Sequence, residues 1–257
     1  MERYFEKDRA QGDLFFEIAV DGKTVRVRAG DAGAAGKETT YPHPTPDAAN
    51  KDAESRIKAK VKDGFVELTG PVVWVLGKGK KPMRKRVPLD ATRVNLSIYN
   101  APQTEIDLRP LAKTNIEELD ISSHALKSID LAALAACKQL SSLYLSRVGI
   151  DRIDLSPLVK CKSLGSLTVR DQKAVDLTQL AGSSIDTLSL MGGAFKTLDL
   201  APLARLAKLE TLHIQQNPKL ASLDVSPIAS HPALKLITLD GPCTVTGTCK
   251  AELRRFT

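Results

Sequence analysis

The 257-residue sequence predicts an α/β protein in two parts: a small N-terminal α+β domain, then a solenoid with parallel strands on its concave face and short helices on its convex face. Three observations lead to this prediction. One apolar phrase recurs every 21 to 25 residues from residue 94 onward. Residues 1–67 lack that phrase and instead alternate apolar and polar residues before a helical segment. The composition, 42% hydrophobic and 26% charged, is that of a folded globular protein and excludes a disordered chain.

The recurring phrase is L-x-L, a polar gap, and then I/L-D-L-x-x-L. Its copies begin at Leu96, Leu119, Leu143, Leu167, Leu188, Leu212 and Ile237, in steps of 23, 24, 24, 21, 24 and 25 residues. Alternate residues of a strand point to the same side, so stacked copies would line one continuous core with both leucines. The pattern resembles the leucine-rich repeat family over residues 94–241, with six copies and a partial seventh. The resemblance implies a solenoid stabilised by contacts between neighbouring copies. The short step predicts a shortened turn around residues 170–174.

An aspartate recurs in the second half of the phrase, at Asp107, Asp130, Asp154, Asp176, Asp199 and Asp224. Six carboxylates at one repeat position could form a ladder that binds calcium. The alternative is that each aspartate accepts a backbone N–H bond in the turn before the helix. We favour the second interpretation, because each copy offers a single carboxylate and no glycine-rich turn. Ser156-Pro157 and Ser226-Pro227 predict a serine N-cap followed by proline at the first helical position.

In the N-terminal domain, residues 2–6, 14–18 and 24–28 alternate as strands do. Gly30, Gly33 and Gly36 then mark a loop. Residues 46–63 are helical in character, with Asp47 as the expected N-cap and Gly64 ending the helix. Residues 65–67 form a final extended piece.

These residues resemble the WGR domain, which occurs in poly(ADP-ribose) polymerases and in many bacterial proteins. The resemblance depends on Phe15-Phe16-Glu17-Ile18, on the glycine spacing that ends in Gly36-Lys37, and on residues 60–67. In the polymerases, the tryptophan and arginine of the Trp-Gly-Arg triplet contact DNA. Here the triplet aligns with Ala29-Gly30-Asp31, which offers no ring to stack and a carboxylate that repels phosphate. The resemblance therefore implies the fold of a bacterial WGR and leucine-rich repeat protein, without that mode of DNA binding.

Residues 68–93 predict a hairpin that covers the open first end of the solenoid. Residues 71–76 and 86–89 would pair, Trp74 would cover the leucines near Leu96, and the basic run at residues 77–86 would form the tip. This segment carries seven basic residues and one acidic residue, and so holds most of the net charge of +7. The alternative is a phosphate-binding patch formed by Lys78, Lys80, Lys81, Arg84, Lys85 and Arg86. With the WGR-like domain, such a patch would make the protein a nucleic-acid-associated adaptor that contacts DNA or RNA.

The sequence contains no motif typical of an enzyme, a cofactor site or a metal site. Its four histidines lack ligand spacing, and Cys243 and Cys249 match no common zinc site. Cys137 and Cys161 share one repeat position and are expected to be small buried residues. The apolar runs are too short to span a membrane, and the N-terminus does not resemble a signal peptide. We therefore expect a cytoplasmic, non-catalytic protein without cofactors, whose residues 242–257 form a tail.

A partner is expected on the concave face, where every second strand residue points outward. Tyrosine and arginine supply much of the binding energy in protein interfaces. The side chains predicted to bind another protein are Tyr99, Tyr144, Arg147, Arg170, Asp171, Met191, His213 and Gln215.

Overall fold

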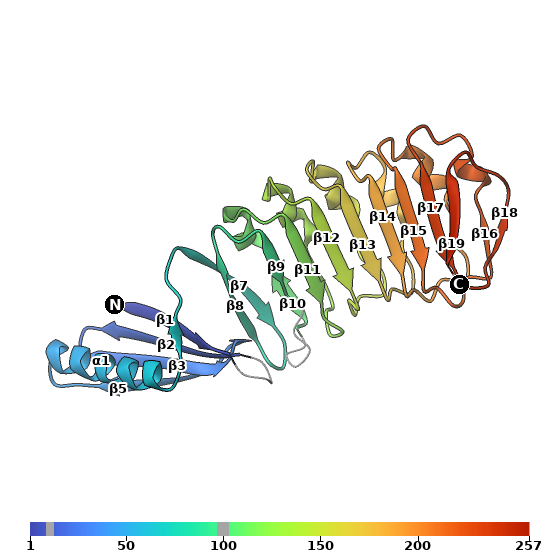
Figure 1. Ribbon diagram of the computed structural model, residues 1–257. Helices are drawn as coiled ribbons and strands as arrows, with labels where there is room; N and C mark the ends of the chain where they lie inside the picture. The colour runs from blue at the N-terminus through green and yellow to red at the C-terminus, as the bar shows by residue number, and fades with distance from the viewer. Residues whose placement is uncertain (9–12, 97–102, 257) are drawn as a thin grey trace.

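The computed structural model describes residues 1–8, 13–96 and 103–256. A sheet with one helix forms the N-terminal unit, and a long solenoid forms the rest of the molecule, with a β-hairpin where the two meet (Figure 1). The N-terminal unit and the solenoid have separate hydrophobic cores, whereas the hairpin contributes to the core of the solenoid.

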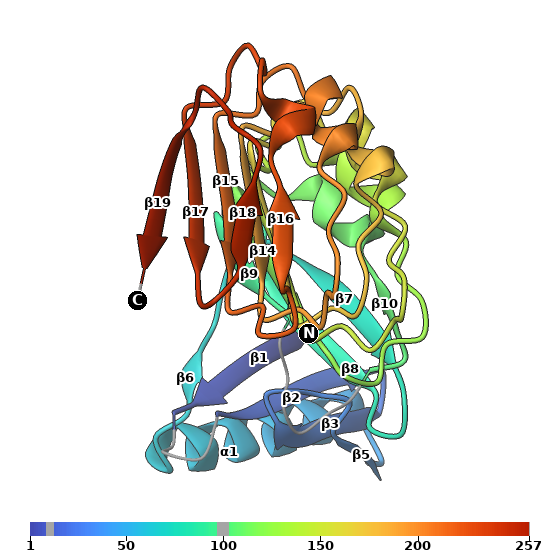
Figure 2. The same cartoon turned by 90° about the vertical axis from the view of Figure 1, so that its right-hand side faces the viewer.

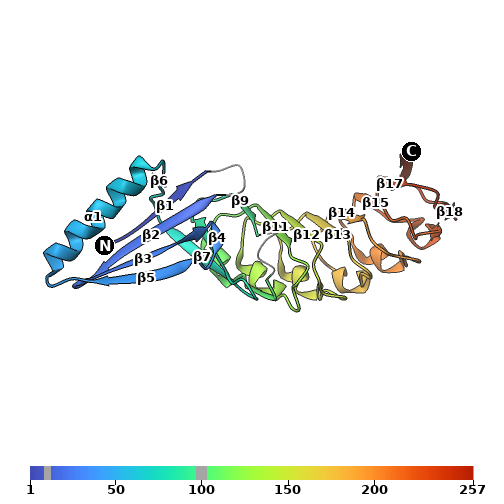
Figure 3. The same cartoon turned by 90° about the horizontal axis from the view of Figure 1, so that it is seen from below.

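The N-terminal unit is a five-stranded antiparallel sheet in the order β5-β3-β2-β1-β6. Its strands are β1 (Glu2–Lys7), β2 (Leu14–Asp21), β3 (Thr24–Asp31), β5 (Lys37–Pro42) and β6 (Val66–Glu67). Helix α1 (Pro46–Lys62) lies along one face of this sheet, where Phe5, Phe16 and Ile18 pack against Ala49, Ala53 and Ile57 (Figure 3). The three predicted strands and the final extended piece are confirmed. Strand β5 is not predicted, because its residues K-E-T-T-Y-P are mostly exposed and show no apolar alternation.

The N-cap of the helix lies two residues before the predicted one. Thr45, not Asp47, is the N-cap: its hydroxyl oxygen accepts a hydrogen bond from the Ala48 N–H at 3.1 Å. Asp47 lies in the first turn instead, where its negative charge interacts favourably with the helix dipole. Gly64 follows the helix at a φ of 88°, as expected for a residue that ends one.

The predicted hairpin consists of β7 (Val72–Lys78) and β8 (Met83–Pro88), which pair antiparallel. Strand β10 (Glu105–Asp107) pairs with β7, and β4 (Gly33–Ala34), inside the predicted glycine loop, pairs with β8. Val73, Val75, Met83 and Val87 belong to the core of the solenoid, so the hairpin covers its first end.

The prediction that Trp74 covers the leucines near Leu96 is wrong. Trp74 lies between Val73 and Val75 on the strand, and alternate residues face opposite sides. Its ring therefore faces the N-terminal unit, 5.4 Å from the Tyr4 ring in an edge-to-face arrangement. The Arg84 guanidinium lies 3.8 Å from the centre of the Trp74 ring.

Ionic contacts also join the N-terminal unit to the hairpin. Glu17, only 6% exposed, pairs with Arg28 of its own sheet and with Arg84 of β8, whose Nη1 lies 2.9 Å from the carboxylate. Arg86 donates hydrogen bonds to the carbonyl oxygens of Leu68 and Thr69, just after β6, both at 3.2 Å, and its guanidinium lies 5.5 Å from the centre of the Tyr4 ring of β1. Two cations of the basic run, Arg84 and Arg86, therefore connect the hairpin to the N-terminal unit.

The solenoid contains an eight-stranded parallel sheet (Figure 1). Its strands are β9 (Arg93–Asn95), β11 (Glu118–Ser122), β12 (Ser142–Ser146), β13 (Ser166–Arg170), β14 (Thr187–Met191), β15 (Thr211–Gln215), β17 (Leu236–Asp240) and β19 (Glu252–Phe256). From β11 to β17 the first leucine of each copy lies beside that of the next, as predicted. In the first copy, however, Val94 and not Leu96 aligns with Leu119, so the first step has 25 residues in place of 23.

Short 3-10 helices stack on the convex side, opposite the sheet (Figure 2). They are η1 (Arg109–Lys113), η2 (Leu131–Ala136), η3 (Ser156–Lys160), η4 (Leu177–Leu180), η5 (Ala201–Arg205) and η6 (Ser226–Ile228). The 21-residue step loses residues in the predicted turn and also in η4, which has four residues where η3 and η5 have five. Cys137 and Cys161 are buried beside these helices, as predicted, and burial raises the pKa of Cys137 to about 11. The architecture is a solenoid, with a parallel sheet on one side and short helices on the other.

The residues predicted as a tail add two strands. Strand β18 (Thr244–Thr246) pairs with β16 (Ser222–Asp224), and β19 extends the main sheet beyond β17. Leu253 of β19 lies beside Ile237 of β17, which continues the repeat register into an eighth coil.

The six recurring aspartates all accept a hydrogen bond from the backbone N–H two residues later, at 2.9 to 3.2 Å. This confirms the backbone-acceptor interpretation. The predicted serine caps are wrong, because Ser156 and Ser226 lie inside the first turn and donate their backbone N–H to Asp154 and Asp224. Among the described residues, no group of three or more histidines, cysteines or carboxylates is placed to hold a metal ion.

Replacing Asp154 with alanine should lower the free energy of unfolding by about 1 kcal/mol, because the Ser156 N–H loses its acceptor. Asp154→Asn is the matched control, since an amide oxygen can accept the same bond and should retain most of the stability. Urea denaturation of the full chain measures both changes. Equal losses in the two variants would contradict the assigned role of the carboxylate.

Candidate partner-binding site

Most of the residues predicted to bind a partner lie together on the concave face. Tyr144, Arg170, Met191, His213 and Gln215 occupy outward positions of the four consecutive strands β12 to β15. Arg147 and Asp171 directly follow β12 and β13. Tyr99 lies outside the described residues.

Tyr144 is an exposed aromatic residue of this face, with 38% of its surface accessible. In the sheet it lies beside Thr168, and Thr168 lies beside Ser189, which is buried despite its outward position. These side chains are shorter than tyrosine, so the Tyr144 ring projects above them. An exposed ring beside small polar residues is a surface that a partner can contact.

His213 is held in place on the same face. Its Nδ1 lies 2.7 Å from the Thr238 hydroxyl oxygen, and the side chain is partly buried. Burial lowers the pKa of His213 below its usual 6.5, so the ring is neutral at physiological pH. Because the folded-state pKa is depressed, the stability that the neutral ring contributes is present above the unfolded-state pKa and is lost as the pH falls through the lower folded-state pKa.

The residue after the strand adopts the left-handed conformation in five successive coils, a feature that the sequence does not predict. This strand-end row consists of Arg147, Asp171, Gly192, Gln216 and Gly241, with φ between 47° and 71°. For a residue with a side chain this conformation costs about 1–2 kcal/mol. Hydrogen bonds between coils offset the cost.

In the strand-end row, the N–H groups of Arg147, Asp171 and Gly192 each donate to the carbonyl of the last residue in the next strand, at 2.9 to 3.1 Å. The Gln216 N–H instead donates to the Asp240 carboxylate, at 2.7 and 2.9 Å to its two oxygens. A backbone N–H of each of these four residues therefore bonds to the next coil, and the last of the four bonds is to a side chain.

Contacts between side chains also connect the coils at this edge. The Arg147 Nε lies 3.1 Å from the Asp171 carboxylate, and the Arg170 Nη2 donates to the Gln216 side-chain oxygen at 3.1 Å. Each contact joins residues at least 24 positions apart in the sequence. Gln216 follows β15 as Asp171 follows β13.

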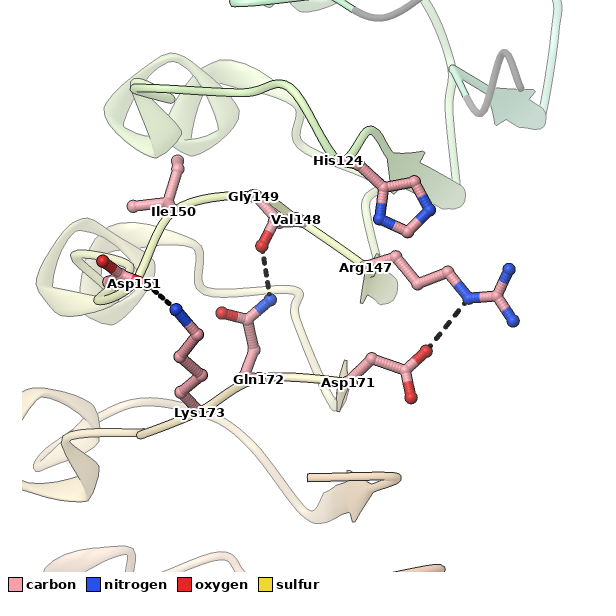
Figure 4. Close-up of a pocket in the computed structure, with 9 residues that line it drawn as sticks. All are labelled: His124, Arg147, Val148, Gly149, Ile150, Asp151, Asp171, Gln172 and Lys173. Atoms are coloured by element: carbon pink, nitrogen blue, oxygen red, sulfur yellow. Dashed lines mark hydrogen bonds and ion pairs between the residues drawn. The ribbon is translucent and has the colours of Figure 1, made fainter. Parts of the chain in front are cut away.

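A pocket of about 410 Å³ opens beside the strand-end row, between the loops that follow β11, β12 and β13 (Figure 4). Arg147 and Asp171 lie at one end, with the His124 ring close to the Arg147 side chain. At the other end, the Lys173 Nζ lies 2.6 Å from the Asp151 carboxylate. The charges of the lining residues are mixed, so the pocket does not select one sign of ligand charge.

The six predicted phosphate-binding cations do not share one surface. Arg84 and Arg86 face the N-terminal unit through the contacts described above, whereas Lys85 occupies the alternate position of β8. The Lys78 Nζ lies 3.0 Å from the Glu105 carboxylate. Lys80 and Lys81 are exposed in the turn between β7 and β8.

Comparisons with known proteins do not assign the chain to a family. No protein-family model matches the sequence. No curated protein matches it either. Among solved structures, internalin C2 of Listeria monocytogenes is 23% identical over 60% of this chain and 73% of that protein, with a TM-score of 0.37. Internalin F of the same organism is 18% identical over 55% of this chain and 46% of its own, with a TM-score of 0.36. A leucine-rich repeat protein of Leptospira interrogans is 19% identical over 57% of this chain and 38% of its own, with a TM-score of 0.44.

The chain spans less than half the length of the second and third of these proteins. Likeness at this level says nothing about partners or activity. In the part of the chain that the structure describes, no helix has both the length and the apolar character needed to cross a membrane.

Replacing Gly192 with alanine should destabilise the protein more than replacing Gly241. Both glycines occupy the strand-end row with left-handed φ, so the backbone cost is similar, about 1 kcal/mol. A methyl group at Gly192 would lie 2.3 Å from the Asp171 Oδ1, whereas one at Gly241 would meet nothing within 4 Å. Urea denaturation compares the two variants. Equal losses would mean that the Asp171 carboxylate does not lie over Gly192.

Proposed function

We propose that the protein is a non-catalytic interaction module that binds another protein across the concave face of β12 to β15. The observation that carries this proposal is that Tyr144 is exposed near Arg147 and Arg170, whose side chains are already held by contacts between coils. Tyr144 and Arg170 are residue types that often dominate binding energy. They would contact the partner together with Arg147, Asp171, Met191, His213 and Gln215.

The side-chain contacts between coils favour binding, because they reduce its entropic cost. Ordering a flexible side chain at an interface costs about 0.5–1.5 kcal/mol. Arg147 is already oriented by Asp171, and Arg170 by Gln216. A partner that accepts hydrogen bonds from these guanidinium groups would meet donors that are largely in position.

In this proposal the protein is non-catalytic and cytoplasmic, and its buried cysteines have a structural role. Burial raises the pKa values of the Cys137, Cys161 and Cys243 thiols, so these groups stay protonated and weakly nucleophilic. All four cysteines are free thiols in the structure.

The N-terminal unit is, in this proposal, a degenerate WGR domain that serves as a structural support for the hairpin. Its glycine spacing has a local reason, because a Cβ atom on Gly36, at a φ of 72°, would lie 2.4 Å from the Phe15 ring. The Ala29-Gly30-Asp31 triplet lies at the end of β3. The contacts of Tyr4 and Glu17 with the hairpin support a role in holding the first end of the solenoid.

The alternative is a nucleic-acid-associated adaptor that uses the basic hairpin. The geometry supports it less well, because Arg84 and Arg86 are engaged with the N-terminal unit and Lys78 with Glu105. Phosphate binding needs cations that can converge on one backbone. Here mainly Lys80 and Lys81 are free to do so.

The double variant Tyr144→Ala, Arg170→Ala should capture at least about tenfold less of the partner that the wild-type protein retains. Affinity capture from native cells, quantified by mass spectrometry, measures this loss. Arg205→Ala, on the exposed convex side of η5, is the matched control and should capture the partner normally.

Thermal melting should show that the double variant is folded, with a midpoint close to that of the wild type, since both side chains are partly exposed. Unchanged capture would reject the concave face as the binding surface. Capture that disappears after nuclease treatment of the lysate would favour the nucleic-acid alternative.

A further inference from the structure

Strand β19 ends the parallel sheet with an exposed edge. Its five residues Glu252–Phe256 are all exposed, including Leu253 and Phe256 at 38% and 51%. Among the described residues, β19 pairs with β17 on one side and with no strand on the other. An edge of this kind presents unpaired backbone groups that can add a further strand.

The free backbone groups of β19 belong to Leu253 and Arg255. The Glu252 N–H donates to the Lys235 carbonyl at 2.8 Å, so the backbone groups of Glu252 face β17. Successive residues of a strand direct these groups to opposite sides, so Arg254 and Phe256 face β17 as well. The N–H and C=O groups of Leu253 and Arg255 therefore point away from the sheet.

We propose that this edge binds a second copy of the chain, with the two β19 strands antiparallel about a two-fold axis at Leu253. Leu253 would then exchange backbone hydrogen bonds with Leu253 of the second copy. The two sheets would become one, and the symmetric contact would close at a dimer. This inference is independent of the concave-face proposal.

The charges of β19 select this register. With Leu253 on the axis, Glu252 lies opposite Arg254 of the second copy, and the reverse pair forms as well. Residues that do not exchange backbone hydrogen bonds have closer side chains in an antiparallel pair, so these two pairs are well placed for ionic contact.

The registers with the axis at Arg254 or Arg255 place like charges together. In a continuous sheet, residues directly opposite one another have their side chains on the same face. The register can therefore shift only in steps that move the two-fold axis from one residue to the next along the strand. An axis at Arg254 brings the two Arg254 side chains together, and an axis at Arg255 brings the two Arg255 side chains together. Like charges directly opposite one another destabilise a sheet.

The same residues already form an ion pair within the strand. The Arg254 Nε lies 2.7 Å from the Glu252 carboxylate, and both side chains are more than half exposed. In the dimer, each charge would gain a second neighbour of opposite sign from the second copy. The strand is therefore complementary to itself, and that complementarity is why we assign a second copy as its occupant.

Sedimentation equilibrium of the full chain tests the proposal over a range of concentrations. The wild type should form dimers, and Arg254→Glu should raise the dissociation constant by about tenfold or more, because it places carboxylates opposite one another. Glu252→Arg should do the same. The double variant Glu252→Arg, Arg254→Glu exchanges the charges and should restore the dimer.

Arg205→Glu, on the convex side, is the control for net charge and should dimerise normally. Circular dichroism should show that every variant retains its fold, since the changed side chains are exposed. A wild-type protein that stays monomeric at every concentration would overturn the proposal. So would a dimer that the single charge reversals leave intact, or one that the double variant fails to restore.

Discussion

Contact between the inward leucines of neighbouring coils is the interaction on which the rest of the structure depends. A single coil cannot bury its apolar side, so each strand is stable only where the next one continues the row. The row runs without a break from Leu119 through Leu143, Leu167, Leu188 and Leu212 to Ile237. Because this register is shared, outward residues that are distant in sequence come within hydrogen-bonding distance. Arg147 and Asp171, which are 24 residues apart, form an ion pair for this reason.

The two ends of the solenoid differ in how they are covered. At the first end, the hairpin places valines and Met83 against the core, while its other face carries Trp74 and Arg84 toward Tyr4 and Glu17 of the N-terminal unit. The hairpin therefore closes the core and fixes the N-terminal unit with the same two strands. At the other end, β19 continues the register with an exposed leucine and an arginine in the inward positions. The proposed dimer would cover the end that the chain's described residues leave open.

The sequence predicts what depends on its period and misses what depends on contacts across coils. The strand positions and the backbone role of the six aspartates follow from residues close together in one repeat. The direction of Trp74 depends on whether Val73 or Trp74 faces the core, a difference of one residue that the apolar run P-V-V-W-V-L does not settle. The left-handed conformation of Arg147, Asp171 and Gln216 depends on acceptors in the following coil. Thr45 was missed as a cap because Asp47 is an equally good cap by residue type.

Inward residues hold the solenoid together, while outward residues are available for recognition. Leu167 and Thr168 are neighbours on β13, the first fully buried and the second on the concave face. Urea denaturation of Leu167→Ala and Thr168→Ala compares the two sides of one strand directly. Leu167→Ala should lower the free energy of unfolding by about 2–5 kcal/mol. Thr168→Ala should change it by no more than about 0.5 kcal/mol. Similar losses for both variants, or a small loss for Leu167→Ala, would contradict this division between inward and outward residues.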